Sequence, residues 1–418
     1  MNIYFSGIGG VGIGPLARIA YDAGYSVVGS DAAESTIVDE LREAGVVVNI
    51  GQDGTFLEAC HSDAPIDWLV YTSALPEDHP ELVFAREHGI KTSKRDEFLS
   101  HIINEKGLKL IAVAGTHGKT TTTGMLVWAL KKLGVPVSYS IGTTISFGPS
   151  GAYDPESEFF VYECDEYDRN FLHYSPALSL ITSFDYDHPD TYPTQAEYTD
   201  AFLTFVKTSA HTILWQNDAE AMTVSLNNSL WVLPASEQSQ IKLAGEHNRR
   251  NANLVLKAIE YLNLASNNLS VEALESFPGT NRRFEKIGDN LYSDYGHHPV
   301  EIAATLSMAK EISDRVTLVY QPHQNQRQHL IKDQYSNQFE NAETIFWLPT
   351  YLSREDPMQA ILTPKDLIVN ITNKNDIRFA ELDDKLWSEI SRERNEGKLV
   401  VCMGAGTIDS WVRKQLQK

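Results

Sequence analysis

The stretch LKLIAVAGTHGKTTTTGMLVWALKKLG, residues 108–134, decides the fold because it reads as a strand, a loop and a helix in that order. Its first seven residues are apolar except for Lys109, which is typical of a buried strand. The helical pattern after the loop extends to about Leu133 and is stopped by Gly134 and Pro136. Strand, glycine-bearing loop and helix are the repeating unit of a parallel sheet covered by helices, so the predicted fold class is α/β.

The loop within this stretch ends in Gly118-Lys119-Thr120, as a phosphate-binding loop does. In such a loop, backbone N–H groups surround phosphate oxygens, the lysine supplies charge near the β- and γ-phosphates, and the hydroxyl ligates Mg²⁺. The usual first glycine would stand at Val113, whereas here Gly115 lies closer to Gly118. The preceding strand, the following helix and a run of four threonines favour ATP binding over a purely structural turn.

Acidic side chains follow the next two predicted strands of this region, 159–162 and 178–182. The carboxyl ends of parallel strands meet at one edge of a sheet, so we expect both groups to face Lys119. Carboxylate oxygens suit Mg²⁺ well, and imidazole is a softer ligand. The residues are Glu163, Asp165, Glu166 and Asp168 after the first strand, and Asp185, Asp187 and His188 after the second.

A second glycine-rich turn lies near the start of the chain, in FSGIGGVGIG, residues 5–14. Gly7-x-Gly9-x-x-Gly12 follows an apolar run and precedes a helical pattern, and Asp31 ends the next strand-like run. Glycine at these positions lets backbone N–H groups approach a diphosphate at a helix N-terminus. The turn predicts a diphosphate site but does not identify the ligand, and a nicotinamide-dependent oxidoreductase is one alternative.

Strands and helices alternate along the whole chain of 418 residues, which is long enough for two to four domains. We predict three α/β domains with boundaries near residues 108 and 279. They are a Rossmann-like domain at 1–107, a central ATP-binding domain with a P-loop type of parallel sheet at 108–278, and a C-terminal Rossmann-like domain at 279–418.

Composition narrows the class of protein further. A net charge of -21 argues against nucleic-acid binding, and it requires local cations or metal wherever phosphate is bound. Three widely spaced cysteines form neither a disulfide framework nor a zinc motif, and no apolar run approaches a membrane span. We therefore expect a soluble cytoplasmic protein without a leader peptide or membrane partner, present as a monomer or weak homodimer.

The order of motifs along the chain resembles that of the Mur ligases of peptidoglycan synthesis. The motifs are AGTHGKTTTT, ECDEYD, DYDHPDTY, GEHNRRNA, GTNRRFE, SDYGHHPVE, QPH and GAGTID. The resemblance covers all three predicted domains. Within the family, the sequence is most similar to the members that join L-alanine to the lactyl carboxylate of UDP-N-acetylmuramate. It implies an ATP-dependent ligase that uses Mg²⁺, passes through an acyl phosphate and releases ADP and phosphate.

The resemblance also implies a role for individual residues. For the UDP-sugar these are Gly9, Gly10, Gly12, Asp31 and Ser73. For ATP they are Gly115, Thr116, His117, Gly118, Lys119, Thr120, Thr121 and Arg283, with His247, Asn248 and Asn251 at the adenine. The implied Mg²⁺ ligands are Thr120, Glu163 and His188, and the implied amino-acid contacts are Tyr295, His297 and Arg327. The implied catalytic residues are Lys119, Glu163, His188, Arg283 and His297, of which His188 and His297 are candidate general bases.

Three features depart from the family pattern. Gln324 stands after QPH where the family usually has arginine, Asn281 replaces a glycine, and the region from Trp215 to Gly245 is short. An arginine fork is the natural partner of a carboxylate, so the amino-acid acceptor stays open. Because ECDEYD and GEHN are similar to the members that attach a recycled tripeptide, a tripeptide ligase is one alternative. A non-catalytic nucleotide-binding relative is another.

Overall fold

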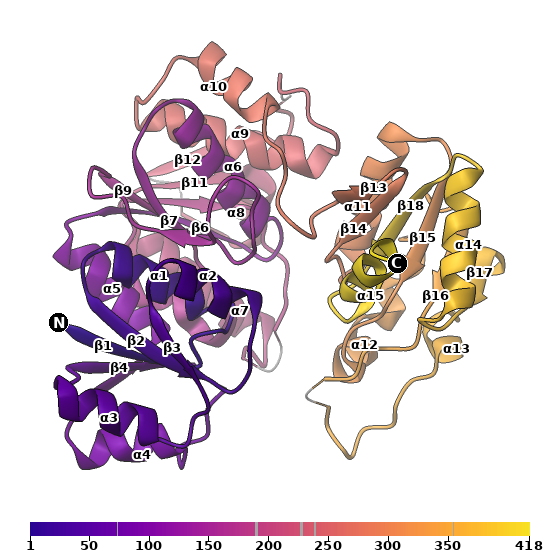
Figure 1. The fold of residues 1–418 in the computed structure, drawn as a ribbon. Coiled ribbons are helices and arrows are strands. Elements are labelled where there is room, and N and C mark those ends of the chain that lie inside the picture. Colours follow the sequence, from indigo (N-terminus) through magenta and orange to yellow (C-terminus); the bar gives the residue numbers. More distant parts are fainter. Residues whose placement is uncertain (73, 189–190, 226–228, 238–239, 354) are drawn as a thin grey trace. The chain divides into compact units, whose positions relative to one another are not determined.

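A computed structural model describes residues 1–418 except 73, 189–190, 226–228, 238–239 and 354 (Figure 1). The described residues form three mostly parallel sheets with helices around them, which confirms the predicted α/β class. The chain divides into two compact units. Residues 1–240 and 251–278 form the first unit, which holds two sheets, and residues 241–250 and 279–418 form the second, which holds one.

The N-terminal sheet has the strand order β3-β2-β1-β4-β5, and all of its strand pairs are parallel. The winding reverses beside β1, so the turn after β1 lies at the switch point where open α/β sheets bind ligands. The strands are β1 (Asn2–Ser6), β2 (Ser26–Asp31), β3 (Val47–Ile50), β4 (Trp68–Tyr71) and β5 (Lys91–Lys94). The helices are α1 (Gly14–Asp22), α2 (Thr36–Glu43), α3 (Thr55–Asp63), α4 (Pro80–Glu87) and α5 (Arg95–Glu105).

The central sheet has the order β12-β11-β10-β6-β9-β7-β8, and only β8 runs antiparallel to its neighbour among the described strands. Its strands are β6 (Lys109–Ala114), β7 (Val137–Ser140), β8 (Gly151–Ala152), β9 (Phe159–Glu163), β10 (Leu178–Ile181), β11 (Thr212–Trp215) and β12 (Leu230–Leu233). Its helices are α6 (Lys119–Lys132), the 3₁₀ helix η1 (Tyr167–His173), α7 (Gln195–Thr208), α8 (Gln216–Ala221), α9 (Glu246–Tyr261) and α10 (Asn267–Glu275).

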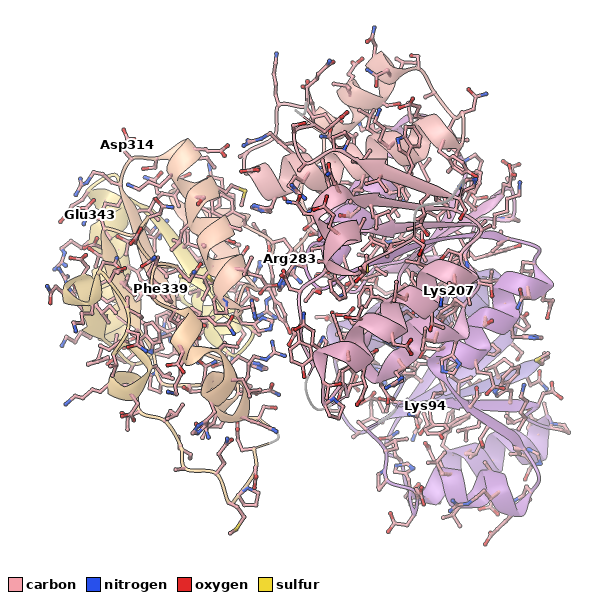
Figure 2. The ribbon with its side chains drawn as sticks, turned by 180° about the vertical axis from the view of Figure 1, so that it is seen from behind. Lys94, Lys207, Arg283, Asp314, Phe339 and Glu343 are labelled. Carbon is pink, nitrogen blue, oxygen red and sulfur yellow. The ribbon has the colours of Figure 1, made fainter. Side chains whose placement is uncertain are left out.

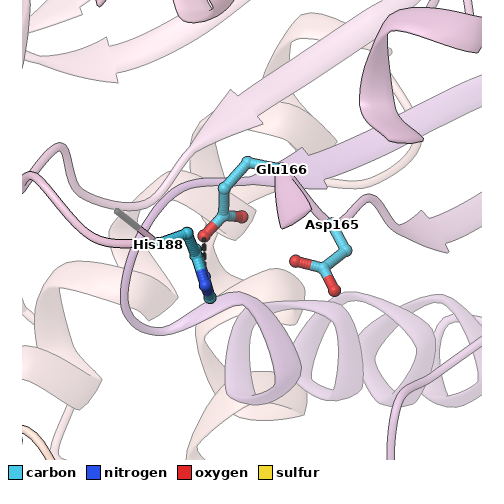
Figure 3. A group of neighbouring side chains, drawn as sticks. All are labelled: Asp165, Glu166 and His188. Atoms are coloured by element: carbon cyan, nitrogen blue, oxygen red, sulfur yellow. Dashed lines mark ion pairs between the residues drawn. The ribbon is translucent and has the colours of Figure 1, made fainter. Parts of the chain in front are cut away.

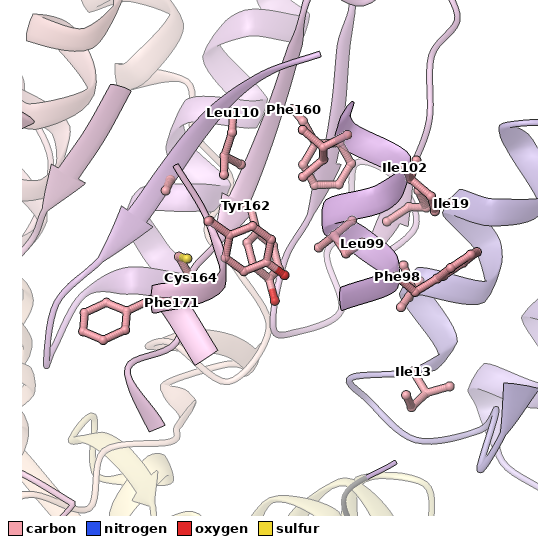
Figure 4. Packing of buried hydrophobic residues seen from close by; sticks show 14 of the residues in the cluster. Ile13, Ile19, Phe98, Leu99, Ile102, Leu110, Phe160, Tyr162, Cys164 and Phe171 are labelled. Atoms are coloured by element: carbon pink, nitrogen blue, oxygen red, sulfur yellow. The ribbon is translucent and has the colours of Figure 1, made fainter. Parts of the chain in front are cut away.

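The two sheets of the first unit share one hydrophobic core, which explains why they form a single compact unit. Ile19 of α1 and Phe98 of α5 belong to the same buried cluster as Leu110 of β6 and Phe160 of β9 (Figure 4). All four side chains are at most 5% exposed. Apolar burial of this kind contributes about 25 cal/mol per Å², so opening the two sheets would expose a costly surface.

The second unit has one sheet of order β13-β14-β18-β15-β16-β17, in which only β13 is antiparallel among the described strands. Apolar side chains of α11 pack on one face, and those of α14 and α15 pack on the other. The strands are β13 (Glu285–Gly288), β14 (Leu291–Asp294), β15 (Val316–Tyr320), β16 (Thr344–Trp347), β17 (Ile377–Phe379) and β18 (Leu399–Met403). The helices are α11 (Pro299–Ile312), α12 (Asn325–Ile331), η2 (Lys332–Gln334), α13 (Pro364–Leu367), η3 (Lys374–Asp376), α14 (Asp384–Asn395) and α15 (Ile408–Leu416). Within the described ranges, no helix is both long and apolar enough to cross a membrane.

A buried carboxylate of α4 ties together the strands that lead into the N-terminal glycine turn. Glu81 is fully buried and accepts hydrogen bonds from Tyr4 Oη and Ser30 Oγ, both at 2.6 Å, and a short one from Ser6 Oγ. Hydrogen bonds to an ionised group contribute about 1.5–3 kcal/mol each, and a hydroxyl left without an acceptor carries a penalty of its own. Glu81 therefore fixes the ends of β1 and β2 beneath the turn.

Replacing Glu81 with alanine is expected to lower the free energy of unfolding by roughly 3 kcal/mol, because three buried hydroxyls lose their acceptor. Urea titration followed by tryptophan fluorescence measures the change. Glu87→Ala, at the exposed end of the same helix, is the matched control and should shift the midpoint little. Equal midpoints for the two variants would contradict the structural role of Glu81.

Candidate active site

The loop between β6 and α6 curls around the ammonium group of Lys119. Lys119 Nζ donates to Gly115 O at 2.6 Å and Thr116 O at 3.3 Å, and it contacts both carboxylate oxygens of Glu166 at 2.8 and 3.0 Å. Burial lowers the pKa of Lys119, but the carboxylates of Glu166 and Asp165 outweigh burial and raise it above its ordinary value. Lys119 is thus a permanently charged group at the floor of the loop.

Two glycines give the loop its shape. Gly115 has a φ of +131°, and an added Cβ would lie 2.4 Å from Thr182 Oγ1. Gly118 has a φ of +87°, and an added Cβ would lie 2.9 Å from Asn251 Oδ1. A side chain at either position would displace these neighbours and strain the backbone.

The other loop residues predicted to bind ATP are anchored to the adjoining strand ends. His117 N donates to Ser183 Oγ at 2.8 Å, and Thr116 Oγ1 donates to Asp185 O at 2.7 Å. Thr121 is half-buried in the first turn of α6. These contacts hold the loop against the segment that follows β10.

The hydroxyl and the carboxylate predicted to share one Mg²⁺ lie together. Thr120 Oγ1 donates to Glu163 Oε1 at 2.7 Å, and Gly142 N donates to Glu163 Oε2, also at 2.7 Å. Glu163 ends β9, directly beside β6, so the parallel pairing brings it to the loop. A hydroxyl and a carboxylate oxygen are hard donors of the kind that Mg²⁺ prefers.

His188, predicted as a further Mg²⁺ ligand, lies against Glu166. His188 Nε2 is 3.3 Å from Glu166 Oε1, and with Asp165 these two residues offer ligand atoms within 4.8 Å of one another (Figure 3). Burial lowers the pKa of His188, but the raising effect of the Glu166 and Asp187 carboxylates is larger, so the pKa lies above its ordinary value. Burial raises the pKa of Asp165, yet Lys119 and His188 bring it below its usual range. Glu166 therefore connects the lysine of the loop to this histidine.

Asp187 accepts a hydrogen bond from His188 N at 2.7 Å, whereas two other acidic residues of the clusters, Asp168 and Asp185, contact different partners. Asp168 forms an exposed ion pair at 3.1 Å with Lys94, which is labelled in Figure 2, and this pair links η1 to the end of β5. Asp185 lies 3.4 Å from His117 Nε2. These contacts connect neighbouring loops of the first unit.

The N-terminal glycine turn is shaped by its own hydrogen bonds. Gly9 N donates to Asp31 Oδ2 at 2.8 Å, and Gly10 N donates to Gly7 O at 3.1 Å. A Cβ on Gly9 would lie 2.9 Å from Ser35 Oγ. Asp31 thus holds the turn in place, and Ser73, also predicted to contact the UDP-sugar, lies outside the described residues.

One pocket of the first unit joins the glycine turn to the carboxylates of the central sheet. The turn contributes Val11 and Gly12, and the carboxyl end of β9 contributes Glu163 and Asp165. Arg95 and Gly142 also line it. The glycine turn and two carboxylates of the central sheet therefore line the same pocket.

The three residues predicted at the adenine divide between the two units. Asn251 belongs to the first unit and lies against Gly118, whereas His247 and Asn248 belong to the second. Asn248 Nδ2 donates to Ala244 O at 3.1 Å and contacts Met308 Sδ. Burial lowers the pKa of His247 to about 4, so its ring is neutral at pH 7.

In the second unit, Asp294 organises the segment that carries Arg283. Asp294 accepts hydrogen bonds from Phe284 N and Gly296 N, both at 2.7 Å. Burial raises the pKa of Asp294 to about 6, against the opposing effect of Arg283. The guanidinium of Arg283, labelled in Figure 2, lies 5.1 Å from the centre of the Tyr295 ring, so these two predicted site residues are neighbours.

The predicted amino-acid contacts lie in the same unit. The rings of His297 and His323 are 5.8 Å apart, and burial lowers both pKa values to about 4. Arg327 Nη1 is buried and has no hydrogen-bond partner among the described residues. Gln324 takes a φ of +59°, and its N–H donates to Tyr351 O at 2.8 Å. The predicted amino-acid site therefore contains two neutral imidazoles, His297 and His323, and the guanidinium of Arg327.

Four residues that contact predicted site residues or line the pocket had no individual role in the sequence predictions. Glu166 stood within a predicted cluster, and Asp294 directly ends strand β14, so position at a strand end was a usable signal. His323 lies in QPH beside the departure at Gln324. Arg95 had no signal, because its contact with Gly12 depends on the folding of distant segments.

Sheet order, loop geometry and the connecting pocket define an α/β protein with a diphosphate-type turn and a phosphate-type loop in one compact unit. The chain belongs to the Mur ligase family. The model described as Mur ligase family, catalytic domain, matches residues 2–106, and the model described as Mur ligase middle domain matches residues 113–236.

Curated relatives match nearly the whole chain. A UDP-N-acetylmuramate–L-alanine ligase from a Nocardioides strain is 32% identical over 430 residues, covering 97% of this chain and 94% of the relative. A protein of the same name from Clavibacter sepedonicus is 33% identical over 397 residues, covering 86% and 81%. These values place the chain within the family along almost its full length.

Solved structures match the fold. A crystal structure of the UDP-N-acetylmuramate-alanine ligase from Thermotoga maritima has a TM-score of 0.79 at 24% identity, covering 100% of this chain and 98% of that one. A murein peptide ligase from Psychrobacter arcticus has a TM-score of 0.65 at 23% identity, with the same coverage. At these identities the likeness concerns the fold alone.

Proposed function

We propose that this chain is an ATP-dependent ligase that joins L-alanine to the lactyl carboxylate of UDP-N-acetylmuramate in peptidoglycan precursor synthesis. The observation that carries the proposal is the pocket lined by both Gly12 and Glu163, the latter of which accepts a hydrogen bond from Thr120 next to Lys119. The near full-length relatives named UDP-N-acetylmuramate–L-alanine ligase support the choice of substrates. The three cysteines are free, which fits a reducing cytoplasm.

The proposed reaction has two steps. A carboxylate oxygen of the substrate attacks the γ-phosphorus of ATP, the bond to the β-phosphate oxygen breaks, and ADP leaves. The amino nitrogen of L-alanine then attacks the carbonyl carbon of the acyl phosphate, loses a proton and displaces phosphate. Both steps bring anions together, so they require fixed positive charge where negative charge develops.

The residues of the first unit fit this requirement. Lys119 supplies charge at the β- and γ-phosphates, and the buried carboxylate of Glu166 holds its ammonium group in place. Thr120 and Glu163, and the group of Asp165, Glu166 and His188, have the donor types that hold Mg²⁺. When bound, Mg²⁺ would neutralise phosphate charge during the transfer.

The second unit is proposed to supply Arg283 to the phosphates and Tyr295, His297 and Arg327 to the amino acid. Burial lowers the pKa of His297 to about 4, so its ring is neutral at pH 7, and its Nδ1 lies 3.1 Å from Tyr295 O; its Nε2 is proposed to take the proton that the amine loses. Arg327 Nη1 has no hydrogen-bond partner among the described residues, so Arg327 is proposed to bind the amino-acid carboxylate in place of the arginine that the family usually has after QPH.

A phosphate-release assay with ATP, Mg²⁺, UDP-N-acetylmuramate and one acceptor at a time tests the proposal. We expect release with L-alanine and weaker release with glycine or L-serine. Release with the recycled tripeptide alone would assign the chain to the tripeptide ligases. No release with any acceptor would leave a non-catalytic nucleotide-binding relative and would refute the ligase proposal.

A further inference from the structure

Arg95 lies directly against the N-terminal glycine turn. It begins α5, immediately after β5, and an added Cβ on Gly12 would lie 2.7 Å from Arg95 Nη1. The guanidinium therefore occupies the space that the missing side chain of Gly12 leaves open. A residue far along the chain is thus placed beside the turn that is proposed to hold a diphosphate.

Arg95 is held by a hydrogen bond at Nε, whereas Nη1 and Nη2 have no hydrogen-bond partner among the described residues. Arg95 Nε donates to Asp96 Oδ2 at 3.3 Å, and buried Asp96 in turn accepts from the hydroxyls of Tyr162 and Tyr174 at 3.1 and 3.0 Å. No hydrogen bond joins Nη1 or Nη2 to another described residue, and the side chain is 32% exposed. This geometry presents two charged donors to the pocket at little cost in side-chain entropy.

The charges of the residues that line the pocket indicate which of them can pair with an anion. Among the described residues that line it, Arg95 carries the one positive charge, and Glu163 and Asp165 carry negative charge. The whole chain has a net charge of -21. An anionic substrate entering this pocket therefore has Arg95 as its local counter-charge.

We propose that Arg95 is a substrate-binding residue whose Nη1 and Nη2 donate to non-bridging oxygens of the UDP-sugar diphosphate. The inference rests on the proposed function. The diphosphate is favoured over the lactyl carboxylate because the guanidinium lies against Gly12 of the glycine turn, whereas the reacting carboxylate must meet the γ-phosphate at the loop that carries Lys119. A guanidinium fork matches the spacing of phosphate oxygens and supplements the backbone donors of the turn.

Calorimetric titration of the full chain with two probes tests this assignment. UDP-N-acetylmuramate carries both anionic groups, and UDP-N-acetylglucosamine carries the diphosphate without the lactyl carboxylate. Arg95→Gln is expected to weaken binding of both probes by the same factor, about 30-fold. Arg95→Lys keeps the charge without the fork and should lie between Arg95→Gln and the unchanged protein. In turnover, Arg95→Gln should raise KM for the UDP-sugar and leave kcat nearly unchanged.

The matched control is Arg42→Gln, which removes the same charge from an exposed ion pair with Glu34 in the same sheet region. It should leave both affinities unchanged, and ATP affinity should be unchanged in every variant. Equal binding of both probes by Arg95→Gln and the unchanged protein would overturn the inference. A loss confined to UDP-N-acetylmuramate would also overturn it, by assigning Arg95 to the carboxylate. If the unchanged protein bound neither probe, the proposed function itself would fail.

Discussion

Replacing Lys119 with alanine is expected to lower kcat by about 1,000-fold, the loss typical of removing one group that stabilises transition-state charge. The ammonium group lies 2.6 Å from Gly115 O and 2.8 Å from Glu166 Oε2, so its position is fixed before ATP binds. Water in the place of the ammonium cannot neutralise the β- and γ-phosphates. Steady-state phosphate release measures the effect, and UDP-sugar affinity should stay near its original value because the glycine turn is untouched.

The same substitution leaves Glu166, a fully buried carboxylate, without its lysine partner. Removing one partner of a buried ion pair typically lowers the free energy of unfolding by about 3–5 kcal/mol, so Lys119→Ala should also lower Tm. The double variant Lys119→Ala with Glu166→Gln removes the unpaired charge and is expected to recover Tm without recovering activity. Lys132→Ala, at the far end of the same helix, is the control for charge alone. Normal turnover by folded Lys119→Ala would contradict the role given to the loop.

Replacing Glu163 with glutamine is the substitution with the second largest expected effect. Glutamine keeps one acceptor oxygen for Gly142 N, and its NH₂ group can donate to Thr120 Oγ1, but it removes the charge that a divalent cation needs. Because a bound cation contributes several kcal/mol of charge stabilisation, we expect kcat/KM to fall by about 100- to 1,000-fold. The Mg²⁺ concentration for half-maximal activity should rise as well.

A magnesium titration of activity separates this role from a structural one. Glu158→Gln, which removes a carboxylate from an exposed pair with Lys109 just before the same strand, is the matched control. It should leave the Mg²⁺ requirement unchanged. An unaltered Mg²⁺ titration for Glu163→Gln would contradict its assignment as a ligand.

Local sequence patterns predicted the α/β class and the strand, loop and helix of residues 108–134, which are β6 and α6 in the structure. The predicted strands 159–162 and 178–182 agree to within one residue with β9 (Phe159–Glu163) and β10 (Leu178–Ile181), because a buried parallel strand is a short apolar run. The expectation that carboxylates after two strands face Lys119 holds for Glu166, which is bonded to it. Strand ends in a parallel sheet converge whatever residues they carry, so the prediction needed no knowledge of distant contacts.

Contacts between segments that are distant in the chain could not be predicted from local sequence patterns. Nothing in the pattern around Arg95 or Asp96 indicates that one lies on Gly12 and the other binds Tyr162. The common core of the first two sheets, and the division of the α9 segment between two units, depend on how whole elements pack. The predicted roles in nucleotide and amino-acid binding remain predictions.

The most direct test of the proposed chemistry follows oxygen from the substrate into phosphate. UDP-N-acetylmuramate labelled with oxygen-18 in its lactyl carboxylate is incubated with ATP, Mg²⁺, L-alanine and the full chain, and the released phosphate is examined by mass spectrometry. An acyl phosphate transfers one carboxylate oxygen to phosphorus, so we predict one labelled oxygen in each phosphate released. Phosphate without label, formed together with the amide product, would contradict an acyl-phosphate ligase.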